Sequence, residues 1–384
     1  MKRIGLLPRL FAAIALGIVV GFFAPEWAIR AMNSFGSTFG QFIKFIVPFI
    51  IVGLVTAAII EAGSAAGRML VMTMAIAWVS TVVFGYFAFF VSSSVFPRIM
   101  DGALVNASAA KTFAPFFTLQ IPPVLDFMTA LVTSFVIGFG AIATRSEVIR
   151  KASIELKEIV SITLAKAFVP FLPLYVFTIM ADLTASGKLA AVGGSSVKIM
   201  VLAIATSVVV LLLQFTIAGI VAGRNPLRCL WNMLPAYLTG WGCCSSAATI
   251  PYTLACAKKN GVSDDTAALV IPLCSSVHMA GSMSNMVIYA MGLIMLCGEP
   301  VSIAAFTEYI LMISVIAIAS PGVPGGIVLA SAGVAEAALG FSPERYALMI
   351  ALYLALDGMG TACNLTGDGA IALIVDRLRG RKDG

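Results

Sequence analysis

Residues 357–368 read Asp-Gly-Met-Gly-Thr-Ala-Cys-Asn-Leu-Thr-Gly-Asp. Four polar side chains, Asp357, Thr361, Asn364 and Asp368, recur there at steps of four, three and four residues. At about 100° per residue they fall on one face of a helix, along about three turns. The surrounding sequence is apolar enough to span a bilayer, and carboxylates in a membrane helix usually line a cavity, a partner helix or an ion path. The stripe therefore predicts a binding or transport site inside a membrane protein.

The composition of the whole chain agrees with this interpretation. Of its 384 residues, 60% are hydrophobic and 11% are charged, whereas a soluble domain carries about 25% charged residues. Long apolar runs satisfy their backbone groups in lipid as helices or as a closed barrel. A barrel would show short alternating segments, and these runs are continuous. We predict an all-α polytopic membrane protein.

Basic residues gather in short clusters between the apolar runs, which does not indicate a nucleic-acid partner. The clusters include Lys2-Arg3, Arg150-Lys151, Lys258-Lys259 and Arg379–Lys382. Cytoplasmic loops of membrane proteins are enriched in Lys and Arg in this way. Counting helices from a cytoplasmic N-terminus gives the same orientation and places the C-terminus in the cytoplasm as well. No cleavage site follows the first apolar run, so we expect it to remain as a membrane helix.

Apolar runs predict the membrane helices of the first part of the chain. They cover approximately residues 5–24, 38–61, 68–96, 122–143, 158–182 and 197–222. The charged segment 145–157 lies between two of these runs and is predicted to be a cytoplasmic loop.

After residue 225 the apolar segments become short and are interrupted by Ser, Gly and Pro. The breaks lie at residues 243–251, 275–282 and 319–326. Each break exposes the N–H groups of a half-helix start, which attract carboxylates. Paired broken segments are typical of the midplane site of secondary transporters. Small residues that only permit close helix packing could explain one break, but three breaks before an acidic stripe favour a functional site.

These motifs resemble those of the dicarboxylate/amino acid:cation symporters, which include sodium-coupled glutamate/aspartate and serine/threonine transporters. Residues 245–251 resemble the serine-rich tip of that family's first re-entrant hairpin, and residues 322–325 resemble the tip of the second. His-Met-Ala-Gly-Ser at 278–282 is similar to the Asn-Met-Asp-Gly-Thr break of its seventh helix, and residues 357–368 match its last helix. The first six apolar runs are similar only in number and hydropathy.

The resemblance implies an architecture of eight transmembrane helices plus two re-entrant hairpins, at about residues 226–258 and 300–341. It also implies a homotrimer in a bacterial or archaeal inner membrane. A scaffold, approximately residues 1–61 and 122–190, would stay fixed in the bilayer. A transport part, approximately residues 68–96 and 195–384, would move like an elevator with the second hairpin as its gate.

The resemblance further assigns roles to individual residues. Asp357 matches the carboxylate that holds the substrate ammonium group, and a buried carboxylate facing a cavity does need a cationic partner. Thr361 and Asn364 match residues at the substrate carboxylate. Asp368 matches a ligand of Na⁺, a hard cation that oxygen ligands suit. The alternative for either carboxylate is a hydrogen bond or ion pair between helices. The other candidate substrate-binding residues are Ser245, Ser246, Met279, Ser282, Gly322, Val323 and Gly325, and the other candidate cation ligands are Asn364, His278 and Ser275.

One departure from the family pattern concerns the substrate. Members that carry acidic substrates have an arginine in the last helix or at the first hairpin tip, where this chain has Gly360 and Cys244. A guanidinium is the natural partner of a carboxylate, and a second desolvated carboxylate without a cation would be costly. We therefore predict import of a small neutral amino acid such as serine, threonine or alanine with a cation. The alternative is a C4-dicarboxylate or acidic amino-acid symporter.

A second departure concerns the coupled ion. Ala280 stands where the family has an aspartate that completes one sodium site, and His278 replaces a neighbouring asparagine. We predict fewer coupled Na⁺ ions than in the members that carry acidic substrates. Because an unperturbed imidazole has a pKa of about 6.5, His278 could instead carry a coupled proton. The alternative is a neutral, hydrogen-bonded histidine in the broken helix.

Three other classes of protein compete with a coupled symporter. An enzyme would need a base beside Ser245 or Cys244, and His278 is the sole histidine. We therefore predict that the protein is not an enzyme. A channel could use the same cavity but could not accumulate a solute against its gradient. An uncoupled exchanger or receptor would fit the missing carboxylate at position 280.

Overall fold

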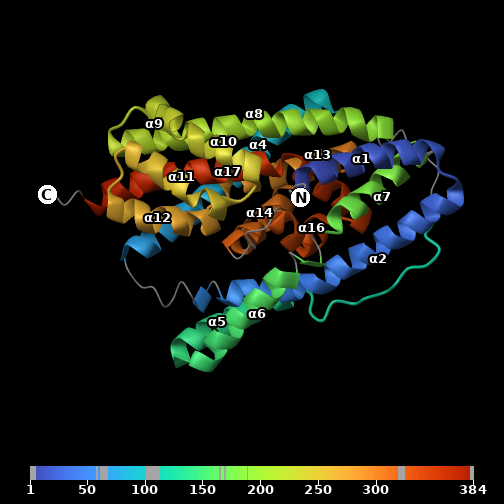
Figure 1. Cartoon of the computed structure of the whole chain (residues 1–384), viewed down its shortest axis with the longest axis horizontal. Helices are drawn as coiled ribbons and strands as arrows, with labels where there is room; N and C mark the ends of the chain where they lie inside the picture. Colours follow the sequence, from blue (N-terminus) through green and yellow to red (C-terminus); the bar gives the residue numbers. More distant parts are fainter. Residues whose placement is uncertain are drawn as a thin grey trace, which may run out of the picture.

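The polar stripe lies on α17 (Pro343–Arg379), which runs through the middle of the molecule (Figure 1). The computed structural model describes residues 6–57, 59–60, 68–100, 113–163, 166–167, 170–187, 189–318 and 325–380. Within these ranges the chain is helical and contains no strand. Two local features start α17: Pro343 stands in its first turn, and the Ser342 hydroxyl accepts a hydrogen bond from the Arg345 N–H at 3.3 Å. Both features favour a helix N-terminus.

Four helical segments of the described chain are long and apolar enough to cross a membrane. They are Met69–Ile99, Gly193–Ala222, Asp264–Leu296 and Arg345–Arg379. Shorter apolar helices cover Ala12–Phe23, Val132–Thr144, Leu172–Ala185 and Ile303–Ile318. A hydrocarbon core of ordinary thickness needs about 20 apolar residues in a helix. The prediction of an all-α chain is confirmed within the described residues, and the length and composition of these helices suit a membrane protein.

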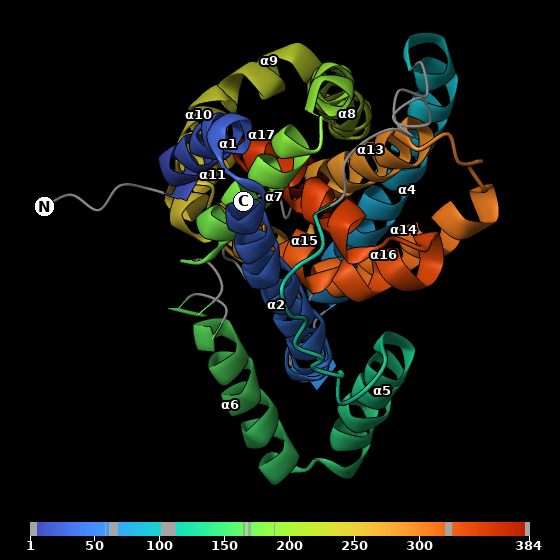
Figure 2. The ribbon, with the colours of Figure 1, turned by 90° about the vertical axis from the view of Figure 1, so that its right-hand side faces the viewer.

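The first part of the chain forms helices close to the predicted apolar runs. They are α1 (Leu6–Phe23), α2 (Glu26–Ile50), the π-helical turn η1 (Ile51–Val55), α4 (Arg68–Ile99), α5 (Phe127–Thr144), α6 (Glu147–Thr163), α7 (Leu172–Ala185) and α8 (Leu189–Ala222). α5 and α6 form a V whose turn lies farthest from α17, with α2 between the V and the other helices (Figure 2).

The prediction of a loop at residues 145–157 is wrong, because all but its first two residues belong to α6. The chain turns at Arg145, which has a left-handed φ of 52°, and α6 begins two residues later. Charged side chains on α6 face outward, and Arg150 pairs with Glu147 at 3.2 Å. Ser153 and Val160 are buried on the opposite side. A strongly charged segment can thus be an amphipathic helix as well as a loop.

Close helix contacts in the first part depend on glycines. A Cβ added to Gly17 would lie 2.6 Å from the Phe177 carbonyl oxygen, and one added to Gly21 would lie 2.5 Å from that of Ala181. α1 therefore packs directly on the α7 backbone through a pair of small residues four positions apart, a common arrangement in membrane helices.

The second part of the chain surrounds α17. It consists of α9 (Pro226–Asn232), α10 (Leu234–Cys243), α11 (Ser246–Lys259), α12 (Asp264–Val277), α13 (Ala280–Leu296), α14 (Ile303–Ile318), α15 (Gly326–Ala330) and α16 (Ala332–Leu339). α17 contacts α8, α10, α11, α12 and α13, and α13 also contacts α4. These contacts bury the polar stripe: Asp357 is 6% exposed and Asp368 is 1% exposed.

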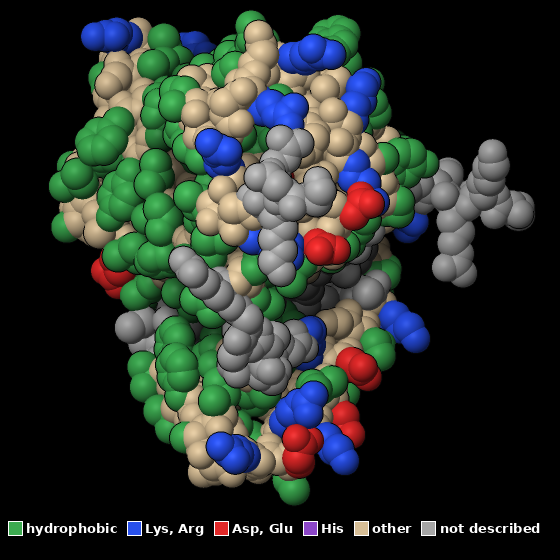
Figure 3. Space-filling view, turned by 90° about the vertical axis from the view of Figure 1, so that its left-hand side faces the viewer, with side chains coloured by type: hydrophobic (Ala, Val, Ile, Leu, Met, Phe, Trp, Pro, Cys, Tyr) green, Lys and Arg blue, Asp and Glu red, His purple; other side chains and the backbone are tan. Residues whose placement is uncertain are grey.

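Charged side chains gather at the end of the molecule that carries α9 and the C-terminus (Figures 1 and 3). Lys258 Nζ lies 2.9 Å from Asp264, and Arg379 lies 3.6 Å from Asp265. Arg224 packs against Gly261 at the same end. The basic clusters after α8, after α11 and at the end of α17 therefore share one face, as the orientation predicted from the sequence requires.

We expect Gly358→Ala to destabilise the protein. A Cβ on Gly358 would lie 2.5 Å from the Trp241 carbonyl oxygen and 3.2 Å from Cys244 Sγ, so α10 would have to move away from α17. Overpacking of this kind costs about 1–3 kcal/mol. The measurement is the midpoint of thermal unfolding in detergent. Gly242→Ala on α10, the helix that Gly358 contacts, is the control, because nothing lies within 4 Å of a Cβ there. Equal midpoints for the two variants would contradict this packing.

Candidate functional site

The segment predicted as a broken seventh helix is interrupted between α12 and α13. His278 has φ −90° and ψ 110°, and Met279 has φ −126° and ψ 33°, so neither residue continues a helix. A helix start leaves N–H groups without intrahelical partners. Asn364 Oδ1 accepts from the Gly281 N–H at 2.8 Å and from the Ser282 N–H at 3.1 Å. A side chain of the polar stripe on α17 therefore caps the start of α13.

A second set of hydrogen bonds centres on the Ser282 hydroxyl. Its oxygen accepts from Asn364 Nδ2 at 2.8 Å and from the Tyr353 hydroxyl at 3.0 Å. Asn364 Nδ2 also lies 3.3 Å from Met279 Sδ. Since a hydroxyl oxygen has two lone pairs, these two donors leave the Ser282 proton for a further acceptor. The cluster presents one free donor to whatever binds beside it.

Asp357 contacts the start of α15. Its Oδ2 accepts from the Gly325 N–H at 2.8 Å, and Tyr353, one turn earlier on α17, interacts with the same carboxylate. Gly325 has a left-handed φ of 72° and directly follows residues 319–324, which lie outside the described ranges. No Lys or Arg is buried in the described part of the chain. Asp357 is therefore a buried carboxylate with neutral neighbours, and such a group favours a cationic ligand.

The turn between α10 and α11 lies against α17 beside Asp357. Cys244 adopts a left-handed φ of 51°, and its Sγ approaches Gly358. Ser245 caps α11 by accepting from the Ala248 N–H at 3.4 Å. Ser246 is the first residue of α11 and is partly exposed. The free N–H groups of this helix start lie at the turn, where a carboxylate would be favourable.

His278 and Asp368 form a separate polar cluster. His278 Nδ1 lies 3.0 Å from Asp368 Oδ1, with both side chains buried. His278 Nε2 lies 3.1 Å from Ser80 Oγ on α4 and 3.2 Å from Gln214 Nε2 on α8. The imidazole thus joins four helical segments, α4, α8, the α12–α13 break and α17. These contacts agree with the alternative prediction from the sequence, a hydrogen-bonded histidine in the broken helix.

Two oxygens of this cluster are buried and have no hydrogen-bond partner within the described chain. They are Asp368 Oδ2 and Gln214 Oε1. A buried polar atom without a partner costs about 1–3 kcal/mol. Carboxylate, amide and hydroxyl oxygens are also the ligands that hard cations prefer. The donor set therefore fits a small hard cation, with Asp368 as its charged member.

Ala280 lies outside this set of oxygens. It is fully buried and belongs to a small apolar cluster with Phe84, Val210, Leu211 and Cys363. No cation ligand replaces the family's aspartate at this position, since a methyl group has no lone pair.

Other predicted site residues lie apart from these two clusters. The Ser275 hydroxyl donates its proton to the Pro272 carbonyl of its own helix at 2.7 Å. Thr361 is buried beside Asp357 on the same helix face. Gly322 and Val323 lie outside the described residues.

Several residues in these clusters were not predicted from the sequence. They are Ser80, Thr81, Gln214, Tyr353 and Asn285. A signal existed for two of them: Gln214 interrupts an apolar run, and Tyr353 precedes Asp357 by one helical turn. The others required knowledge of which helices meet.

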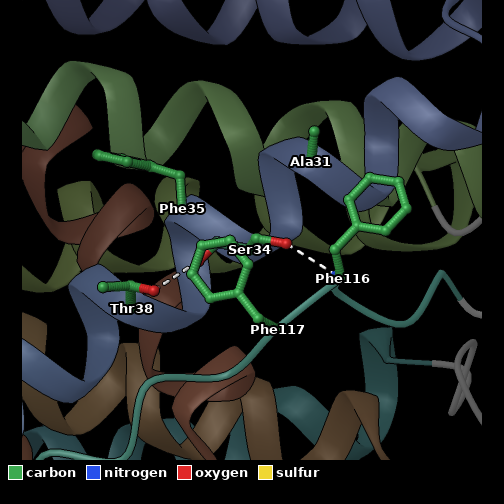
Figure 4. A pocket seen from close by; sticks show the side chains of 6 residues that line it. All are labelled: Ala31, Ser34, Phe35, Thr38, Phe116 and Phe117. Carbon is green, nitrogen blue, oxygen red and sulfur yellow. Dashed lines mark hydrogen bonds between the residues drawn. The ribbon is translucent and has the colours of Figure 1, made fainter.

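A cavity of about 290 Å³ lies elsewhere, between α2 and residues 116–117 (Figure 4). It is lined by Ala31, Ser34, Phe35, Thr38, Phe116 and Phe117. Ser34 Oγ already accepts from the Phe116 N–H at 2.8 Å. The cavity has no ionisable lining residue and shares none with the clusters on α17, so we place the functional site at α17.

Comparison with known proteins identifies the family of the chain. The model of the sodium:dicarboxylate symporter family matches residues 6–378. The chain belongs to this family. It is similar to the serine/threonine transporter SstT of Acinetobacter baylyi, with 24% identity over 98% of both chains. It is also similar to SstT of Streptococcus thermophilus, with 25% identity over 99% of this chain and 98% of the relative.

Family membership settles the class of the protein. It is a multi-pass membrane transporter and not an enzyme, with a small-molecule substrate and a coupled cation. The predicted resemblance is confirmed.

Proposed function

We propose that this protein imports a small neutral amino acid of the serine/threonine type together with Na⁺. The observation that carries the proposal is the surroundings of Gly360. A Cβ there would meet Asn285 Nδ2 and Ser282 Oγ, both at 3.3 Å, and no cationic group. An acidic substrate would bring a second carboxylate to a site without a cationic partner, since no Lys or Arg is buried in the described chain. A neutral side chain fits these polar, uncharged neighbours.

In this proposal Asp357 holds the substrate ammonium group. The ammonium would replace the Gly325 N–H as the partner of Oδ2, and a full positive charge is the stronger partner for a buried carboxylate. Because Gly325 adjoins the proposed tip of the second hairpin, this exchange would link substrate binding to movement of the hairpin. Thr361 and Asn364, together with Ser245 and Ser246 at the start of α11, would lie at the substrate carboxylate.

The cation would bind at Asp368. The unpartnered oxygens of Asp368 and Gln214 support this placement, and His278 holds the other carboxylate oxygen in position. Ser275, near the C-terminal end of α12, remains a candidate cation ligand. Ala280 supports a smaller number of coupled Na⁺ ions than in members with a carboxylate there. The alternative is a proton that is coupled in place of Na⁺, and experiment must distinguish the two ions.

We further propose an elevator mechanism with eight transmembrane helices and two re-entrant hairpins. α9–α11 and α14–α16 would be the hairpins. α4, α8 and residues 226–380 would form the transport part, and α1, α2 and α5–α7 the scaffold. Val132, Val136 and Phe139 on α5 are more than half exposed, which suits contact with lipid or with two further copies in a homotrimer. The charged end in Figure 3 would face the cytoplasm of a bacterial or archaeal cell, with both termini on that side.

The names of the relatives support the choice of substrate. Two relatives that align along nearly the whole chain are named serine/threonine transporters. For this reason, and because polar groups lie beside Gly360, we propose that serine and threonine are better substrates than alanine.

The test of the substrate class is competition binding on purified protein. Radiolabelled serine is bound in the presence of Na⁺, and unlabelled serine, threonine, alanine, aspartate, glutamate and succinate are added as competitors. We expect serine and threonine to compete at concentrations at least about 100-fold lower than aspartate, because a desolvated carboxylate without a partner costs at least about 3 kcal/mol. Stronger competition by aspartate or succinate would support the acidic-substrate alternative and refute the proposal.

We expect Gly360→Arg to lower serine affinity at least about tenfold. The new side chain would push Ser282 and Asn285 away from position 360 and place a charge beside these uncharged groups. A loss of about 1.4 kcal/mol corresponds to a tenfold loss of affinity. The same competition assay measures this change. Unchanged serine affinity would show that the substrate does not approach position 360.

A further inference from the structure

Asn285 carries a polar group that the proposed binding of the amino-acid backbone does not use. It lies on α13, one turn after Ser282, and is 2% exposed. Its Oδ1 lies 3.3 Å from Ser207 Oγ on α8. Its Nδ2 lies 3.3 Å from the position that a Cβ of Gly360 would occupy, and the hydrogen bond found for this side chain in the described chain uses Oδ1 and not Nδ2. A ligand atom that accepts from Nδ2 would therefore add a hydrogen bond.

Two polar atoms of α13 lie close to Gly360. Ser282 Oγ lies 3.3 Å from the same Cβ position, and its proton is free to be donated because both lone pairs accept hydrogen bonds. Gly360 follows Asp357 by three residues, a rise of about 4.5 Å along the helix. In serine the hydroxyl is two bonds from the α-carbon that bears the ammonium group. A hydroxyl at Gly360 is therefore compatible with an ammonium group at Asp357.

A hydroxyl is the chemical group that fits this space best. It can accept from Ser282 and from Asn285 Nδ2. If the amide is turned so that Oδ1 faces Gly360, the hydroxyl can donate to that oxygen, because a hydroxyl both donates and accepts. The methyl group of alanine would leave the amide without a partner. A site built to hydrogen-bond a substrate hydroxyl discriminates strongly against an analogue that lacks it.

We propose that Asn285 is a specificity-determining residue that selects amino acids with a side-chain hydroxyl over alanine. This inference rests on the proposed function, since it concerns which neutral amino acid the same site prefers. Gly360 is needed beside it, because any side chain there would occupy the space of the hydroxyl. Ser207 positions the amide from α8.

The test is the ratio of the dissociation constants of alanine and serine, measured for each protein by equilibrium binding. We expect the wild-type ratio to be at least about 10, and we expect Asn285→Leu, a change that nearly conserves volume, to lower it about tenfold. Tenfold corresponds to one hydrogen bond of about 1.4 kcal/mol. Substitution does not strip Ser207 of its partners, because its hydroxyl also donates to the Ala203 carbonyl at 2.9 Å.

The matched control is Asn232→Leu. Asn232 is an amide that donates to Asn260 Oδ1 at 2.8 Å, away from α13 and Gly360. We expect the ratio of the alanine and serine dissociation constants of the Asn232→Leu variant to equal that of the wild type. Gly360→Ala is a second variant that leaves Asn285 intact. Its methyl group would stand in the hydroxyl's place, and we expect the ratio to fall there as well.

The outcomes separate the two proposals. If wild-type protein binds serine and alanine but the ratio is unchanged in Asn285→Leu, the role of Asn285 is refuted and the proposed function stands. If Asn285→Leu does not fold, an unchanged ratio in Gly360→Ala refutes the role. If wild-type protein binds neither amino acid, the proposed function and this inference are both wrong.

Discussion

Asp357→Asn is expected to abolish amino-acid binding and uptake. The buried carboxylate accepts from a neutral donor in the described chain, the Gly325 N–H, and it supplies the negative charge for the substrate ammonium group. Removing one partner of a buried ion pair costs about 3–5 kcal/mol, so we expect at least a 100-fold loss of affinity for serine, by order of magnitude. Equilibrium binding of radiolabelled serine to the purified variant measures the loss.

The control for this variant is Asp376→Asn on the same helix. Asp376 accepts from the Ser263 hydroxyl and N–H at the charged end of the molecule and takes no part in the proposed site. It should bind serine as the wild type does. Retained binding in Asp357→Asn would mean that another group holds the ammonium.

Asp368→Asn is expected to remove the dependence of serine binding on the cation. Asp368 is the charged member of the oxygen set, and an amide is a much weaker ligand for a hard cation than a carboxylate. We expect the Na⁺ concentration for half-maximal serine binding to rise at least about 100-fold, which corresponds to about 2.7 kcal/mol of lost cation binding.

A titration of serine binding against Na⁺ at constant ionic strength measures this effect. A parallel titration with choline as the added cation is the control for ionic strength. An unchanged Na⁺ requirement in Asp368→Asn would place the cation elsewhere. A requirement for protons in the wild type, with no response to Na⁺, would support H⁺ as the coupled ion.

The polar stripe on α17 shows how much of the site a single helix can predict. Asp357 and Asp368 are both buried on that helix, and the spacing of residues 357–368 was sufficient to indicate it. The break at His278 was also predictable, because small and polar residues interrupt an apolar run there. Both features are local in sequence, where helical periodicity decides.

Contacts between helices could not be predicted in the same way. The hydrogen bonds of both polar atoms of the Asn364 amide at the start of α13 were not predicted from the sequence. Ser80 and Gln214 reach His278 from α4 and α8, which are separated from it by 198 and 64 residues. Only the packing of the helices brings such residues together. α6 was missed as a helix because its charge suggested a loop, although its charged residues lie on one side.

Gradient-driven uptake in liposomes tests cation-coupled import of a neutral amino acid most directly. Purified protein is reconstituted, a Na⁺ gradient or a pH gradient is imposed separately, and the accumulation of radiolabelled serine and aspartate is followed over time. We predict that an inward Na⁺ gradient drives serine above its external concentration, that aspartate does not accumulate, and that collapsing the gradient ends the accumulation. Accumulation of aspartate in preference to serine would contradict this proposal. So would serine uptake whose internal concentration never exceeds the external one.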